Sequence, residues 1–406
     1  MIAALADGSS RLMNFSNSDD CEATLSCLTQ LGVLIERRGH ELLVHGVGTD
    51  GLRAPAEPLD CTNSGTTMRL LAGILAGQNF KSTLIGDKSL RSRPMARIIE
   101  PLQMMGASIS SNDGRAPLVI EGHKPLKAIN HELPVASAQV KSCILLAGLS
   151  ASGQTQVIES QVTRDHTERM LRWVGVPLEI RDVESLRAIT VGGPERFNGR
   201  DVSIPGDISS AAFFISAAAL LPGSALEIND VGVNPTRVTF VEQLKSLGFD
   251  VAVSDVREEC NEAVGMIRVS GSKSSSESAT PLRGPLIPQL IDELPLLAVV
   301  GSQIEGGIEI RDAAELRAKE SDRIAATVQN LRAMGAEVEE FKDGLRVSGP
   351  TQLRGAEIDP HGDHRIAMAF SVAALIARGE TEIRDPECVA VSFPEFFELL
   401  ESVVER

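Results

Sequence analysis

The feature that most constrains this fold is an internal repeat. Five segments begin with small or polar residues and continue into an apolar helix: TNSGTTMRLLAGILAG from Thr62, ASAQVKSCILLAGLSASG from Ala136, PGDISSAAFFISAAALLPG from Pro205, PQLIDELPLLAVVGSQIEGG from Pro288 and HGDHRIAMAFSVAALIARG from His361. Short β-like runs such as STLIGD, ALEIND and TEIRD follow most of them. One such unit cannot bury its apolar face alone, so the units must pack on each other. The alternation of helix and strand predicts an α/β or α+β protein whose sheets are covered by helices.

A second helix completes each unit, and it often ends in a glycine before an extended run. The glycines of this series are Gly32, Gly106, Gly175, Gly248 and Gly335, which lie 74, 69, 73 and 87 residues apart. FPEFFELLESVVER begins a sixth second helix at the C-terminus. The longest interval contains SKSSSESAT (residues 272–280), whose polar, serine-rich composition predicts a surface loop.

Six second helices therefore face only five complete first helices. MIAALADG at the N-terminus matches the tail of a sixth, which predicts that the first repeat lacks its strand and helix start; a native start with a short helix is the alternative. The opening run is too short for a signal peptide and has no basic residues before it. We place a domain boundary at the Leu-Pro-Gly of residues 221–223. This gives a first domain over 1–222, with three repeats of which the first is truncated, and a second domain of three repeats over 223–406.

Composition excludes several classes of partner. The formal net charge of −16 disfavours nucleic-acid and anionic-membrane surfaces, and aromatic residues at 3% leave little for base stacking. No stretch approaches the roughly 20 apolar residues of a membrane span. The six cysteines are scattered without a C-x-x-C pair, which predicts neither a zinc site nor a disulfide framework and favours the cytoplasm.

Basic residues recur where helices begin, although the positive end of the helix dipole favours negative charge there. They are Lys88, Arg91 and Arg93 in GDKSLRSRP, Arg164 and His166 in TRDHTE, Arg237 in NPTR, Lys319 and Arg323 in AKESDR, and His364 and Arg365 in GDHR. Any one of them could be an ordinary surface residue. As a set at equivalent points of a repeat, they predict an anionic small-molecule ligand that carries phosphate or carboxylate groups.

Other residues are suited to acid–base chemistry. Asp292 precedes a helix in IDEL, and Glu320 lies between two cations, which would keep its carboxylate ionised as a base. A helix cap for Asp292 and an ion pair for Glu320 are equally open. For His364 three roles stay open, namely a base, a hydrogen-bond donor to phosphate and a structural histidine. The Asn63-Ser64-Gly65-Thr66 turn is suited to a close approach to an anion. No Walker loop or metal-binding histidine pair occurs, so protein cations must hold the phosphate, and without a G-x-S-x-G elbow nucleophilic catalysis lacks support.

The motifs NSGTTMR, GDKSLRSRP, SAQVKS, RDHTE, NPTR, AKESDR and GDHRIAMAF, in this order, resemble the 5-enolpyruvylshikimate-3-phosphate (EPSP) synthase family along the whole chain. The resemblance implies transfer of the enolpyruvyl group of phosphoenolpyruvate to shikimate 3-phosphate, with release of phosphate, in the pathway to chorismate and the aromatic amino acids. It also implies a two-domain inside-out α/β barrel of six βαβαββ-type units, with helix N-termini directed at a cleft. No cofactor or metal is implied, and we expect a monomer.

Residue roles follow by motif. Phosphoenolpyruvate would be held by Asn63, Gly65, Arg93, Gln139, Arg323 and Arg365, with His364 beside them. Shikimate 3-phosphate would be held by Ser137, Ala138, Gln139, Arg164, Asp292 and Lys319. Asp292 would accept the proton of the attacking hydroxyl, and Glu320 would assist proton transfer to the methylene carbon.

The chain also departs from the family pattern. Family members begin with a P-G-D-K-S-x-S-H-R type segment that contacts both substrates; here it would lie before Met1, so the sequence predicts impaired activity or a non-catalytic anion-binding fragment. Val391 stands where one class carries a lysine. Several motifs resemble the second, glyphosate-tolerant class, which predicts reduced inhibition by glyphosate, although Gly65 matches sensitive forms. The related UDP-N-acetylglucosamine enolpyruvyl transferases normally carry a reactive loop cysteine, which has no counterpart here.

Overall fold

The computed structural model describes residues 1–272, 274 and 281–404, and the chain forms two compact units, Met1–Ile204 and Pro205–Arg406. The observed division lies 18 residues before the predicted boundary at 222. The Leu-Pro-Gly turn is not a linker, because it joins α8 (Ile208–Leu220) to β14 (Ala225–Gly232) within one repeat. Most of the serine-rich segment 272–280 lies outside the described residues, so its prediction as a loop is not assessed.

The first unit contains three repeats. The first repeat comprises α1 (Ile2–Leu5), β1 (Asp7–Met13), α2 (Asp19–Gln30), β2 (Leu34–Arg38) and β3 (Glu41–Val47). The second comprises β4 (Leu59–Asp60), α3 (Gly65–Ala76), β5 (Lys81–Ile85), α4 (Lys88–Ser92), α5 (Ala96–Met104), β6 (Ser108–Asn112) and β7 (Arg115–Glu121). The third comprises β8 (Leu126–Lys127), β9 (Asn130–Glu132), α6 (Ala138–Gly148), β10 (Ala151–Glu159), α7 (His166–Trp173), β11 (Leu178–Val183) and β12 (Leu186–Gly193), and β13 (Val202–Ser203) ends the unit.

The second unit repeats the pattern. After α8 and β14 come α9 (Thr239–Ser246), β15 (Asp250–Glu259) and β16 (Glu262–Ser270). The next repeat comprises η1 (Gly284–Leu286), α10 (Ile287–Leu290), α11 (Leu294–Gly301), β17 (Ile308–Ile310), η2 (Ala314–Ala318), α12 (Arg323–Ala333), β18 (Val338–Phe341) and β19 (Gly344–Val347). The last comprises β20 (Glu357–Ile358), α13 (His364–Ile376), β21 (Glu382–Ile383), η3 (Pro386–Val391) and α14 (Phe396–Val403).

The sheets share one strand order. In the first unit the orders are β13-β1-β3-β2, β4-β5-β7-β6 and β11-β12-β10-β8, with β9 also beside β10; in the second they are β14-β16-β15, β17-β19-β18 and β20-β21. The short leading strand pairs in parallel, as in β4·β5, whereas the hairpin strands pair antiparallel, as in β6·β7. A parallel neighbour requires a crossover, and the first helix of the repeat supplies it. The mixed α/β class with two domains is confirmed.

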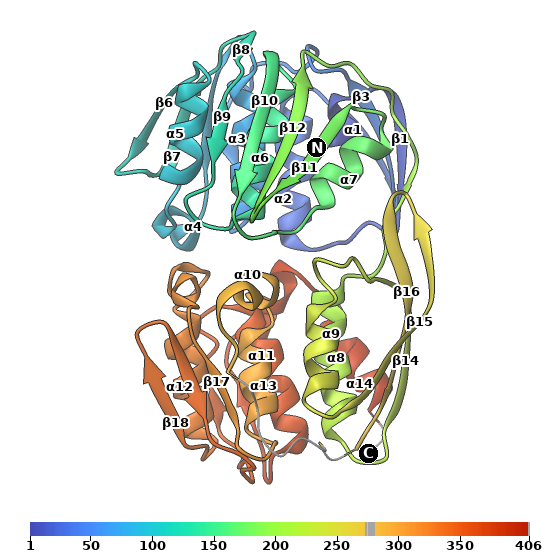
Figure 1. Ribbon diagram of the computed structural model, residues 1–406, viewed down its shortest axis with the longest axis vertical. Helices are drawn as coiled ribbons and strands as arrows, with labels where there is room; N and C mark the ends of the chain where they lie inside the picture. Colours follow the sequence, from blue (N-terminus) through green and yellow to red (C-terminus); the bar gives the residue numbers. More distant parts are fainter. Residues whose placement is uncertain (273, 275–280, 405–406) are drawn as a thin grey trace. The chain divides into compact units, whose positions relative to one another are not determined.

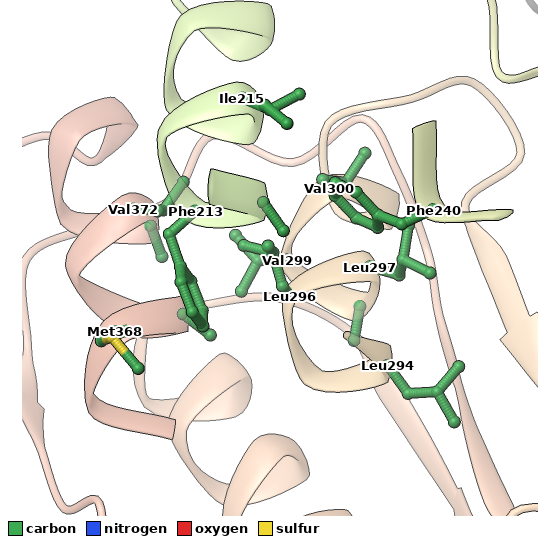
Figure 2. Close-up of a cluster of buried hydrophobic side chains, with 14 of the residues drawn as sticks. Phe213, Ile215, Phe240, Leu294, Leu296, Leu297, Val299, Val300, Met368 and Val372 are labelled. Carbon is green, nitrogen blue, oxygen red and sulfur yellow. The ribbon is translucent and has the colours of Figure 1, made fainter. Parts of the chain in front are cut away.

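The first helices form the cores because they are apolar on all sides, and such a helix must be enclosed. All eight residues of α11 are buried. Figure 1 shows α11 and α13 between the β14–β16 and β17–β19 sheets. Figure 2 shows side chains of α8, α11 and α13, including Phe213, Leu296 and Met368, packed together. In the first unit, α3 and α6 pack so closely that a Cβ on Gly73 would lie 2.2 Å from the carbonyl oxygen of Cys143.

The glycine series ends the second helices as the sequence indicated. Gly32, Gly106, Gly175, Gly248 and Gly335 all have positive φ angles, between 82° and 105°. Glycine takes this left-handed conformation without the steric cost that a Cβ would bring, and it turns the chain from helix to strand. Among the described residues, no single helix is long and apolar enough to cross a bilayer, although the bent pair Gly284–Leu290 and Leu294–Gly301 meets the length and composition criteria jointly.

Candidate active site

Arg323 is the centre of a buried ion cluster in the second unit. It is the first residue of α12, and its side chain is 1% exposed. Its Nε donates to Asp363 Oδ2 at 2.8 Å, its Nη2 to Glu320 Oε2 at 2.5 Å, and its Nη1 to Asp292 Oδ1 at 3.3 Å. Burial disfavours the guanidinium charge, but these three carboxylates outweigh that cost and raise the pKa of Arg323. The predicted grouping of Asp292, Glu320 and Arg323 is therefore present.

Asp363 organises this cluster, and the sequence analysis did not select it. Its carboxylate is fully buried and caps α13 by accepting from Arg365 N at 3.0 Å. It accepts from both Nε and Nη2 of Arg323, at 2.8 and 3.3 Å, and from Ser321 Oγ at 3.1 Å. The Asp363 carboxylate thus holds two residues that the sequence predicted as ligand-binding, Arg323 through its side chain and Arg365 through its amide. The only sequence signal for this residue was its place in GDHR, where an Asp before a helix is expected as an ordinary N-cap.

Arg365 also lies close to Asp292. Its Nε is 3.7 Å from Asp292 Oδ1, and its Nη1 is 3.9 Å from Glu293 Oε1. Asp292 therefore faces Arg323 and Arg365 together. Lys319 follows η2, and burial lowers the pKa of its ammonium against the opposing pull of Asp292, Glu315 and Glu320. The predicted set in the second unit is locally assembled around Asp292.

His364 opens α13 and is almost completely buried. Burial, assisted by Arg365 and Arg323, lowers the pKa of its imidazole to about 4, although Asp363 and Glu320 pull the other way. The ring is therefore neutral near pH 7. Its Nδ1 has no hydrogen-bond partner within the described part of the chain. A neutral imidazole can hydrogen-bond a ligand but adds no positive charge to the cluster.

A second network joins the starts of α8 and α9 to this region. Arg237 Nη2 donates to Ser209 Oγ at 2.5 Å and to Asp207 Oδ1 at 3.1 Å, and Ser209 Oγ donates to Glu293 Oε1. Burial tends to raise the pKa of Asp207, but Arg237, Arg365 and the hydrogen bonds from Ser210 lower it overall. Arg237 was among the predicted cations, whereas Ser209 and Glu293 were not assigned contacts.

In the first unit, Asn63 and Arg93 are joined directly. Arg93 Nη2 donates to Asn63 Oδ1 at 2.5 Å and to Ser89 Oγ at 3.2 Å. Asn63 Nδ2 in turn donates to Asp87 Oδ2 at 2.7 Å, and the other oxygen of Asp87 caps α4. Arg93 is buried, so its guanidinium is held in one position by these bonds. Two residues that the sequence assigned to phosphoenolpyruvate are therefore in direct contact.

Arg69 connects Gln139 to the same turn. Its Nη1 donates to Gln139 Oε1 at 2.6 Å, and Gln139 Nε2 donates to Thr66 Oγ1 at 2.7 Å. A Cβ placed on Gly65 would lie 2.7 Å from Arg69 Nη1 and 3.2 Å from Arg93 Nη1. Two guanidinium groups therefore converge on Gly65, and a methyl group there would require Arg69 to shift. The sequence analysis missed Arg69, whose signal was a single cation in an otherwise apolar helix.

Ser137 and Ala138 begin α6, with Ser137 Oγ accepting from Val140 N at 3.4 Å. Arg164 lies in the turn before α7, and α6 and α7 are linked by a 2.7 Å hydrogen bond between Ser142 and Thr167. The predicted residues for shikimate 3-phosphate are thus divided between the two units, as are those for phosphoenolpyruvate. Among the described residues, His, Cys, Asp and Glu form no group of three or more that could hold a metal ion.

Comparison with known proteins identifies the family. Residues 1–400 match the family described as EPSP synthase (3-phosphoshikimate 1-carboxyvinyltransferase). A 3-phosphoshikimate 1-carboxyvinyltransferase of Koribacter versatilis is 51% identical over 100% of this chain and 93% of its own length. The chain belongs to the EPSP synthase family. A relative of the same name from Salinibacter ruber is 49% identical over 99% of this chain and 93% of its own length.

Solved structures agree with this assignment. An EPSP synthase from Acinetobacter baumannii matches with a TM-score of 0.85 and 42% identity, over 99% of this chain and 91% of that one. The EPSP synthase family resemblance stated from seven motifs is confirmed. The segment expected before Met1 lies outside this sequence, and the expectation about it stays a prediction.

Proposed function

We propose that this EPSP synthase family member transfers the enolpyruvyl group of phosphoenolpyruvate to the 5-hydroxyl of shikimate 3-phosphate and releases phosphate. The observation that carries the residue assignment is the position of Asp292. Its Oδ1 lies 3.3 Å from Arg323 Nη1 and 3.7 Å from Arg365 Nε. Two guanidinium groups stabilise its ionised form, and an ionised carboxylate beside two anion-binding forks is suited to accept a proton from a bound hydroxyl.

The reaction needs a balanced exchange of bonds. The hydroxyl oxygen bonds to C2 of phosphoenolpyruvate while Asp292 takes its proton, and the C2–C3 π pair takes a proton at C3. The C2–O bond to phosphate then breaks, and return of a C3 proton to the Glu320 carboxylate restores the double bond. Glu320 is the acid at C3 in this proposal, because it lies 2.5 Å from Arg323 at the same cluster.

The cations stabilise the charge that the reacting groups carry. Arginine forks suit phosphate and carboxylate because they donate two parallel hydrogen bonds. In this proposal the residues that hold phosphoenolpyruvate are Arg323, Arg365, Arg93, Asn63 and Gln139. Shikimate 3-phosphate is bound by residues 137–139, Arg164, Lys319 and Asp292. His364, neutral because of its burial, donates or accepts a hydrogen bond beside phosphoenolpyruvate.

Phosphate release tests this proposal. The purified protein is incubated with phosphoenolpyruvate and shikimate 3-phosphate, and the enolpyruvyl ether is identified by mass. UDP-N-acetylglucosamine replaces shikimate 3-phosphate as a control acceptor. We expect phosphate and the ether only with shikimate 3-phosphate. Tight binding of both substrates without any release would instead support the anion-binding fragment predicted from the sequence.

Asp292→Asn tests the base. It keeps the side-chain volume but removes the proton acceptor, and general-base catalysis contributes about 10²–10⁴-fold. We expect kcat to fall within that range while the affinity for phosphoenolpyruvate stays close to that of the unsubstituted enzyme. Near-normal turnover in this variant would exclude Asp292 as the base.

The remaining proposals concern inhibition, assembly and location. Glyphosate is an anion that would compete for the same cations, and resemblance to the second class supports reduced sensitivity. A monomer and a cytoplasmic location complete the proposal, the latter from cysteine usage in the sequence. An inhibition curve, analytical ultracentrifugation and cell fractionation test the three points in turn.

A further inference from the structure

A second buried ion cluster lies in the first unit, around Lys141 on α6. Lys141 has no solvent exposure, and its Nζ lies 2.7 Å from Glu168 Oε1 and 3.2 Å from Glu159 Oε2. Both carboxylates are buried too, and burial raises the pKa of Glu168 despite the opposing effect of Lys141. Well-packed apolar side chains often stabilise a core as well as or better than such a buried ion cluster. Stability alone therefore does not account for these three residues.

The three residues come from elements that surround the loop bearing Arg164. Lys141 lies on α6, one turn after Ser137, and its amide donates to the Ser137 carbonyl at 3.1 Å. Glu159 is the last residue of β10, and Glu168 lies in the first turn of α7. The loop between β10 and α7 is consequently tied to α6 at both of its ends.

Glu159 also fixes the backbone next to Arg164. Its Oε2 accepts from Thr163 Oγ1 at 2.7 Å and from Thr163 N at 3.3 Å. Thr163 is buried and immediately precedes Arg164 in the chain. The hydrogen bond between Ser142 and Thr167 adds a tie on the far side of the loop. A displacement of Glu159 would therefore pass directly to Arg164.

We propose that Lys141, Glu159 and Thr163 are positioning residues for shikimate 3-phosphate. They hold Arg164 in register with the first turn of α6 without touching the ligand themselves. This inference rests on the proposed assignment of Arg164 and residues 137–139 to that substrate. It requires that the affinity for shikimate 3-phosphate depends on the cluster, while the affinity for phosphoenolpyruvate does not.

Glu159→Gln is the first test, because it keeps the volume but loses the charge facing Lys141. Titration calorimetry measures the Kd of shikimate 3-phosphate, and steady-state kinetics measure the KM of both substrates. We expect the Kd to rise about tenfold or more, because weakening a charge-assisted hydrogen bond from a displaced Arg164 costs about that factor in affinity, with the KM of phosphoenolpyruvate unchanged. Thr163→Val removes only the Oγ1 hydrogen bond and should give a smaller loss of the same kind.

A variant in which the whole buried ion cluster is replaced by neutral side chains separates the positioning effect from loss of folding. Lys141→Met alone leaves two carboxylates buried without their cation, so it is combined with Glu159→Gln and Glu168→Gln. The triple variant should fold and show the same selective loss of shikimate 3-phosphate affinity. Asp50→Asn, which removes the partner of Lys124 elsewhere in the unit, is the control and should change neither constant. Unchanged shikimate 3-phosphate affinity in the folded triple variant, or equal losses for both substrates, would overturn the inference.

Arg164→Ala separates this inference from the proposed function. If Arg164→Ala binds shikimate 3-phosphate as tightly as the unsubstituted enzyme, the assignment of Arg164 fails and the inference fails with it. If Arg164→Ala weakens binding but Glu159→Gln does not, the assignment stands and only the positioning role is wrong.

Discussion

Replacing Arg323 by methionine should destabilise the second unit strongly, whatever it does to catalysis. The substitution keeps an unbranched side chain but leaves Asp363, Glu320 and Asp292 without the guanidinium that they share. Asp363 has no solvent exposure, so water cannot replace the lost partner. Removing one member of a buried ion pair costs about 3–5 kcal/mol.

The loss converts into a measurable shift. The second unit spans 202 residues (406 − 204). For a domain of roughly this size, 1 kcal/mol corresponds to about 2–4 °C in Tm, so we expect a fall of about 6–20 °C. Differential scanning calorimetry of the whole protein measures it. Arg346→Met is the matched control: its guanidinium is 56% exposed and pairs with Glu309, and such a pair contributes about 0–1 kcal/mol.

The stability of Arg323→Met should also depend on pH. In Arg323→Met, protonation of a carboxylate relieves the uncompensated charge in the folded state. The folded state then gains protons relative to the unfolded one, so the free energy of unfolding should fall as the pH rises from about 5 to about 8. Adding Asp363→Asn should recover part of the loss and flatten this slope. A Tm equal to that of Arg346→Met would refute the reasoning.

Three further predictions concern the ligand-facing residues. The pKa of His364 is about 4 in the folded state against about 6.5 when unfolded, so the unfolded state binds more protons between these pH values. The free energy of unfolding should therefore fall by up to about 3 kcal/mol as the pH drops through this window. In denaturant unfolding, His364→Gln should lose less of its stability on going to pH 4.5 than the unsubstituted protein does. Arg93→Ala removes charge-assisted hydrogen bonds of about 1.5–3 kcal/mol and should raise the KM of phosphoenolpyruvate accordingly, so an unchanged KM contradicts its role. Gly65→Ala places a methyl group 2.7 Å from Arg69 Nη1 and should raise both the glyphosate concentration for half-inhibition and the KM of phosphoenolpyruvate; if neither changes, the space at Gly65 is not limiting.

The repeat was predictable because its signals are local. Apolar first helices, their small N-capping residues and the glycines after second helices each depend on a few neighbouring residues. Ser64, Ser137, Asp207 and Asp363 all accept hydrogen bonds from helix amides at the predicted starts. The position of the domain boundary was wrong because Leu-Pro-Gly punctuates a turn inside a repeat as readily as a linker between domains.

The partners of the predicted cations could not be read from the sequence. Asp363 lies 40 residues from Arg323, and Glu168 lies 27 residues from Lys141. Each of these acids has a satisfactory local explanation as a residue of a first helical turn or its cap. Tertiary packing, within one repeat for Glu168 and between neighbouring repeats for Asp363, shows that each neutralises a buried cation, and periodicity carries no information about that pairing.

The net charge of −16 is compatible with buried cations because carboxylates pair with them, as they do around Arg323. Arg323 is surrounded by three carboxylates, so an incoming anion must take the place of one of them and cannot simply be added. Asp363 is fully buried and fixed by α13, whereas Asp292 and Glu320 are 14% and 18% exposed, so these two are the carboxylates that can yield. A carboxylate displaced from Arg323 by phosphoenolpyruvate would lie beside the ligand and gain proton affinity as it loses its cation. We propose that Glu320 is the carboxylate that yields, so that the same exchange would prepare it to deliver a proton.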